Sequence, residues 1–162
     1  MIKFKRFASV LTLGACLVAS PGMAAGGGGP LEPANIDLDN VASLQRGARN
    51  FMNYCSGCHS AQYVRYSTIG KQLGLSDEQI MDNLMFNAEK TFETIQTAMP
   101  ADAAARWFGQ PPPDLSLMAR ARGADYVYNF LKGFYVSESS PTGANNVVLA
   151  GTSMPNVLWE LQ

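Results

Sequence analysis

Histidine is almost absent from this sequence, which has one, at position 59, and only three cysteines. A structural zinc site needs four ligands, almost always cysteine or histidine in pairs, and this chain has few residues of either type. Charged residues are also scarce, at 15%, and the twelve lysines and arginines do not outnumber the thirteen acidic residues. Without a basic patch, a nucleic-acid partner is not expected. The length fits one globular domain.

The longest hydrophobic run lies at the N-terminus. The basic stretch "MIKFKR" is followed by uncharged "FASVLTLGACLVAS" and by small residues in "PGMAA", which is the pattern of a secretory signal peptide, residues 1–24. An uncleaved anchor is the alternative, but Pro21 and Gly22 cut the run short. Cleavage after Ala24 removes three of the twelve basic side chains and none of the thirteen acidic ones, leaving a net charge of about −4. Such an acidic surface would suit a cationic protein partner.

Cys16 lies inside this predicted signal peptide, after "LTLGA". That string also resembles a bacterial lipoprotein acceptor site, so lipidation of Cys16 is the alternative to simple removal. In either case the folded domain contains only two cysteines, Cys55 and Cys58.

After the signal peptide, residues 25–40 are rich in glycine and proline and are predicted to form a flexible leading segment. Residues 41–162 form the domain, and its apolar spacing is mainly helical. Helices are predicted over 41–54, 76–86, 100–108, 114–122 and 124–134. Ser76 with Gln79 predicts a capping box, Asp114 an N-cap and Gly123 a helix stop. Residues 137–155 are predicted to be a long loop, so the fold class is mainly α with long irregular loops.

The string "CSGCH" places Cys55, Cys58 and His59 within five positions. Zinc lacks a fourth ligand, and a thioredoxin-like dithiol expects a βαβ setting that the helical pattern does not offer. A disulfide would close a loop too short to constrain the unfolded chain much, and would leave His59 unexplained. Covalent haem attachment uses all three residues, because each thiol can add to one vinyl group while the histidine ligates the iron. Export to an oxidising compartment agrees with this interpretation.

The second axial position of the iron is open to a methionine, since no other histidine exists. Met99 and Met154 each lie in irregular chain just before a proline, whereas the other methionines of the domain lie in helical patterns or one turn before Cys55. Residue patterns alone leave these two nearly equal. His–Met ligation favours electron transfer and raises the reduction potential.

From residue 43 to residue 160 the chain resembles cytochrome c1, the haem subunit of quinol:cytochrome c reductase. The resemblance is carried by "RGARNFMNYCSGCHS", "YVRY", "PPDLSLMARARG", "DYVYNFLKGFY" and "GTSMPNVL". It implies a cytochrome c-like haem domain with one haem c, held by Cys55, Cys58, His59, Pro113, Arg122, Tyr126 and Met154. In this set Met154 is the sixth ligand, Pro113 packs on the haem, Arg122 lies near a propionate and Tyr126 lies at the haem pocket. From the residues alone, Arg122 could equally be a solvated helix-end charge and Tyr126 an ordinary core aromatic.

The resemblance also implies the biological setting. The protein would not be an enzyme on its own. It would pass single electrons from a Rieske iron–sulfur protein to a soluble cytochrome c, beside cytochrome b, on the periplasmic side of the bacterial inner membrane. Members of the family normally continue into a membrane anchor, so the chain is expected to be a C-terminally truncated form that alone would be periplasmic and soluble. The alternatives are a free-standing periplasmic cytochrome c and a haem enzyme or sensor with an open iron position.

Overall fold

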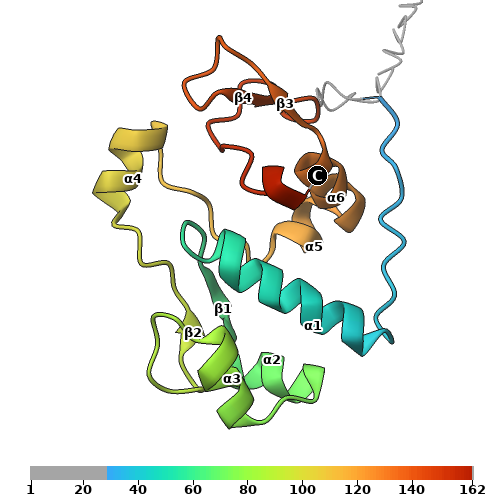
Figure 1. Ribbon diagram of the computed structural model, residues 1–162, viewed down its shortest axis with the longest axis vertical. Helices are drawn as coiled ribbons and strands as arrows, with labels where there is room; N and C mark the ends of the chain where they lie inside the picture. The colour runs from blue at the N-terminus through green and yellow to red at the C-terminus, as the bar shows by residue number, and fades with distance from the viewer. Residues whose placement is uncertain (1–28, 162) are drawn as a thin grey trace, which may run out of the picture.

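The computed structural model describes residues 29–161 (Figure 1). The predictions for residues 1–24, including Cys16, lie outside this range. Within it the chain is mainly helical, with six α-helices and four short strands. In chain order the elements are α1 (Val41–Asn50), a π-helical turn η1 (Phe51–Cys55), β1 (Ala61–Arg65), α2 (Tyr66–Leu73), α3 (Asp77–Leu84), β2 (Thr94–Ile95), α4 (Ala101–Phe108), α5 (Met118–Arg122), α6 (Ala124–Lys132), β3 (Phe134–Val136), β4 (Ala144–Asn146) and η2 (Trp159–Leu161).

The hydrophobic core lies in the first half of the described chain. It is built from η1, the antiparallel pair β1–β2, α2 and α3, and its buried members are Met52, Ala61, Tyr66, Ile80, Leu84 and Ile95. Helices α2 and α3 approach closely at Gly70, where an added Cβ would overlap the Ile80 side chain. This core fixes the far end of α1, which continues without a break into η1 and the cysteine motif.

The second half of the described chain is organised around α6 and a second antiparallel pair, β3–β4. Tyr126 and Phe130, four positions apart on α6, stack with ring centres 6.4 Å apart, and Phe130 meets Phe134 edge to face at 5.2 Å. The segment before α1 is tied to α6 by hydrogen bonds between Glu32 and Asn129 and from the Ala34 amide to the Asp125 carboxylate. Figure 1 shows this leading segment running along one side of the molecule to α1.

Several sequence predictions are confirmed in detail. The capping box of α3 forms in both directions between Ser76 and Gln79. Gly109 ends α4 and Gly123 ends α5, both with a positive φ.

Other predictions are wrong. Asp114 does not cap α5, which begins only at Met118 and has no side-chain cap; Asp114 instead bonds to the segment after the histidine. Helix α2 and the four strands were not predicted, and β4 interrupts the expected loop over 137–155. Among residues 29–161, no helix has the length and hydropathy needed to cross a bilayer.

Candidate haem-binding site

The cysteine motif forms one tight turn at the end of η1. The backbone carbonyl of Cys55 accepts hydrogen bonds from the amides of Cys58, at 3.0 Å, and His59, at 2.8 Å. The buried Ser56 closes the preceding turn, because its hydroxyl donates to the Met52 carbonyl at 2.8 Å. Both thiols are free and half-buried. Burial raises the pKa of both, and the neighbouring Cys58 thiol adds to the effect at Cys55, so both are protonated at neutral pH.

The His59 ring is oriented by a proline. Its Nδ1 lies 2.7 Å from the backbone carbonyl oxygen of Pro113, 54 positions further along the chain. A carbonyl oxygen can only accept a hydrogen bond, so Nδ1 must carry the proton. In the neutral imidazole with this tautomer, the other ring nitrogen, Nε2, has the lone pair that can ligate a metal. The donor set therefore fits an iron porphyrin held by two thioethers and one imidazole.

A strap of hydrogen bonds, made by residues 60–63 with residues 114–116, holds this histidine and proline together. The Leu115 amide donates to the Ser60 carbonyl at 2.8 Å. The Gln62 amide donates to the Asp114 carboxylate at 2.9 Å, and the Tyr63 amide to the Ser116 hydroxyl at 3.1 Å. These three bonds hold together the two segments that directly follow His59 and Pro113.

Asp114 is the charged member of this strap. Partial burial would raise the pKa of its carboxyl group, but hydrogen bonds from the Ser116 hydroxyl and from the amides of Gln62 and Ser116 outweigh burial and lower the pKa below the ordinary value. Asp114 is therefore ionised at neutral pH and binds both segments as a carboxylate.

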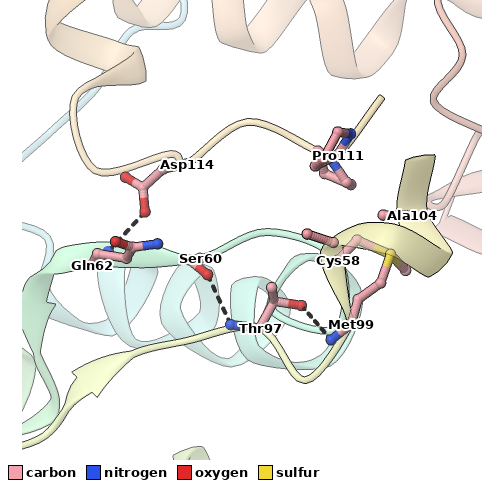
Figure 2. A pocket seen from close by; sticks show the side chains of 10 residues that line it. Cys58, Ser60, Gln62, Thr97, Met99, Ala104, Pro111 and Asp114 are labelled. Atoms are coloured by element: carbon pink, nitrogen blue, oxygen red, sulfur yellow. Dashed lines mark hydrogen bonds between the residues drawn. The ribbon is translucent and has the colours of Figure 1, made fainter. Parts of the chain in front are cut away.

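A second segment, residues 97–99, crosses the other side of the motif (Figure 2). The Thr97 amide donates to the Ser60 hydroxyl at 2.9 Å, and the Thr97 hydroxyl donates to the Gly57 carbonyl at 2.8 Å. The Met99 amide donates to the Thr97 hydroxyl at 3.1 Å. Met99 and Cys58 line a pocket of about 170 Å³. Sites for drug-sized ligands start at about 300 Å³, so this pocket can border a porphyrin but cannot enclose one.

Arg122 and Tyr126 form a pair where α5 meets α6. The guanidinium carbon lies 5.4 Å from the centre of the tyrosine ring, in a cation–π arrangement. Arg122 is exposed and Tyr126 is half-buried, next in line to Phe130. The guanidinium thus lies over the tyrosine ring, and among the described residues no hydrogen bond or ion pair of its side chain competes with this contact.

Met154 is half-buried in the segment between β4 and η2, and its amide donates to the Thr152 hydroxyl at 3.3 Å. The structure thus places the predicted site residues in three groups: the motif with Pro113, the Arg122–Tyr126 pair, and Met154. Three residues that hold the motif were not predicted, namely Ser60, Thr97 and Ser116. Only the spacing of Asp114 and Ser116, which is typical of a side-chain turn, offered a local signal.

Two cysteines three positions apart, followed directly by an oriented histidine, are the pattern of a c-type haem protein. Residues 36–161 match the sequence profile of the Cytochrome C1 family, and the chain belongs to this family. Membership implies a covalently bound haem c.

Curated relatives agree with this assignment. Cytochrome c1 of Allochromatium vinosum is 51% identical over 140 residues, which cover 86% of this chain and 57% of that protein. A protein named ammonia monooxygenase gamma subunit, from Nitrosomonas europaea, is 42% identical over 82% of this chain and 56% of its own length. Cytochrome c1 of Rhodospirillum rubrum is 36% identical over 118 residues. The chain thus spans little more than half the length of the first two relatives.

Proposed function

We propose that this protein carries single electrons through one haem c, attached at Cys55 and Cys58 and ligated axially by His59 and Met154. The observation that supports this most directly is the contact of 2.7 Å between His59 Nδ1 and the Pro113 carbonyl. This contact holds the orientation of the imidazole and keeps the proton on Nδ1, which leaves Nε2 to ligate iron.

Each residue has a distinct part in this proposal. The two cysteines would hold the haem at the turn that ends η1, and His59 would ligate its iron through Nε2. The bound haem supplies an iron that alternates between the ferric and ferrous states. Met154 would supply a thioether as the second iron ligand, and because thioether ligation favours ferrous iron it would raise the reduction potential. Met99 is the competing thioether, held beside Cys58 by Thr97.

Arg122 and Tyr126 are proposed to serve the haem propionates and the pocket wall. A carboxylate near the protein surface is stabilised by a guanidinium, which stays protonated and can form two parallel hydrogen bonds. Tyr126 holds that guanidinium from one side. Pro113 is proposed to pack on the ring through its side chain while its carbonyl holds His59.

The setting that fits best is a respiratory cytochrome bc complex on the periplasmic side of a bacterial inner membrane. There the protein would receive electrons from a Rieske iron–sulfur subunit, lie beside cytochrome b and reduce a soluble cytochrome c. The relatives named cytochrome c1 support this setting. Oxidoreductase activity would belong to the complex and not to this chain alone.

Replacement of the two candidate methionines in the holoprotein tests the ligand assignment. Met154→Ala should abolish the weak red absorption band of methionine-ligated ferric haem, lower the midpoint potential and open the ferrous iron to carbon monoxide. Met99→Ala should leave all three properties close to wild type. The reverse pattern would assign the ligand to Met99. Carbon monoxide binding by the wild-type protein would favour an enzyme or sensor with an open position.

A further inference from the structure

Asn146, at the end of β4, is the most deeply buried polar residue of the described chain, with no exposed surface. Both polar atoms of its side-chain amide form hydrogen bonds. Nδ2 donates to the Phe130 carbonyl of α6 at 2.7 Å, while Oδ1 accepts from the amides of Val148, at 2.8 Å, and Leu149, at 3.2 Å. A buried amide is costly unless its polar atoms are paired, and here both are.

These contacts join the C-terminus of α6 to the chain that follows β4. The Phe130 carbonyl lies in the last turn of α6, where carbonyls lose their intrahelical partners, and it accepts from both Gly133 and Asn146. The approach is close, since a Cβ on Gly133 would lie 2.8 Å from the Asn129 carbonyl and 2.9 Å from Val147 Cγ2. Asn146 therefore anchors the loop to a rigid helix end.

The network continues from Asn146 to Met154. The Asn145 side-chain oxygen accepts from the Gly151 amide at 2.8 Å, which closes the loop over Asn146. The Thr152 amide donates to the Leu149 carbonyl at 3.3 Å, and the Thr152 hydroxyl accepts from the Met154 amide at 3.3 Å. In Figure 1 the segment after β4 returns from the β3–β4 pair toward α5 and α6. A continuous series of hydrogen bonds thus leads from α6 to the candidate axial ligand.

We propose that Asn146 is a positioning residue for the axial ligand: it holds the 146–154 loop against α6 so that the Met154 thioether is presented to the iron. This inference rests on the proposed ligand role of Met154. Only an amide of this length provides a donor to Phe130 and an acceptor for Val148 and Leu149 together. An ionised aspartate has no donor, and a serine is too short to reach both partners.

The test measures competition between Met154 and free imidazole in the ferric holoprotein. A poorly held methionine is displaced more easily, so Asn146→Asp should bind imidazole roughly tenfold more tightly than wild type and show a weaker red band. Asn145→Asp is the matched control, because the bonds that Asn145 makes to Gly151 and Asn146 use its oxygen as an acceptor, which aspartate retains. Its imidazole affinity should stay within about twofold of wild type.

Two further variants keep the outcomes distinguishable. Asn146→Ser shortens the side chain without adding charge, so that it no longer reaches both partners, and it should show the same direction of change if Asn146→Asp does not fold. A lower unfolding midpoint with unchanged imidazole affinity would overturn the inference, because it would make Asn146 a stabilising residue only. Met154→Ala separates this failure from a failure of the proposed function: if that variant keeps the red band, the ligand assignment itself is wrong.

Discussion

Arg122 lies over the ring of Tyr126, 5.4 Å from its centre, with Gly123 between their two helices. The two side chains therefore act as one unit at the α5–α6 junction. Arg120 is on the same short helix and is also exposed, but residues two apart on a helix point in different directions.

Arg122→Gln should lower the midpoint potential of the haem by an amount on the order of tens of millivolts, because loss of a nearby positive charge stabilises the ferric state. Arg120→Gln should change it little, and redox titration of the two holoproteins compares them. Equal shifts would mean that the arginines act only through their net charge, and Arg122 would then not be a site residue.

Attachment of the haem should depend separately on the two thiols. Cys55→Ser and Cys58→Ser should each leave one thioether, and the double variant should release all haem on extraction with acidified organic solvent. Mass spectrometry of the denatured proteins, matured in a host with the attachment machinery, reads this directly. A wild-type protein with only the mass of its polypeptide would refute covalent attachment.

Asp114 should make the free energy of unfolding depend on pH in the acid range. Its folded-state pKa is lowered, from an unfolded value near 3.9, so its contribution is fully present above about pH 5 and is lost as pH falls through the folded pKa. Asp114→Ala should therefore reduce the free energy of unfolding by about 1–3 kcal/mol at neutral pH, since it leaves the Gln62 and Ser116 amides without their acceptor.

The difference between wild type and Asp114→Ala should shrink below about pH 4. Denaturant unfolding at a series of pH values measures it. A difference that stays constant down to pH 3 would show that the charge of the carboxylate does not contribute.

Two helical glycines give a paired stability test. Gly70→Ala places a methyl group against the buried Ile80 and should cost about 1–3 kcal/mol. Gly47→Ala, in α1, meets nothing within 4 Å and should stabilise the protein by roughly 0.5–1 kcal/mol through helix propensity. Thermal unfolding distinguishes them, and a Gly70→Ala variant at least as stable as wild type would contradict the packing of α2 on α3.

Local signals in the sequence predicted the parts of the fold that local chemistry decides. Ser76 and Gln79 are three positions apart and cap α3, and the cysteine motif is contiguous. Helix α2 was missed because it has no side-chain cap and contains Gly70; burial of Tyr66 and Leu73 stabilises it instead.

The candidate site could be predicted only in part, because many of its contacts are not local in the sequence. The pairing of His59 with Pro113 joins residues 54 positions apart, and Asp114 was assigned to a helix because its partner Gln62 is 52 positions away. The burial of Asn146 likewise depends on α6, whose Phe130 carbonyl it binds. No local pattern of residues specifies such contacts, since they exist only once distant segments have come together.

The hydrophobic core lies in the first half of the described chain, and this position affects the order in which the chain folds. The buried members of the core all lie between residues 52 and 95. The His59–Pro113 contact and the strap next to it instead join residues more than 50 positions apart, so long loops must close before they form. Closing long loops costs chain entropy, so contacts near in sequence form first. We expect Cys55 and Cys58 to remain accessible on a nascent chain until the 113–116 segment arrives, which leaves a time window in which haem can be joined to them before the fold closes.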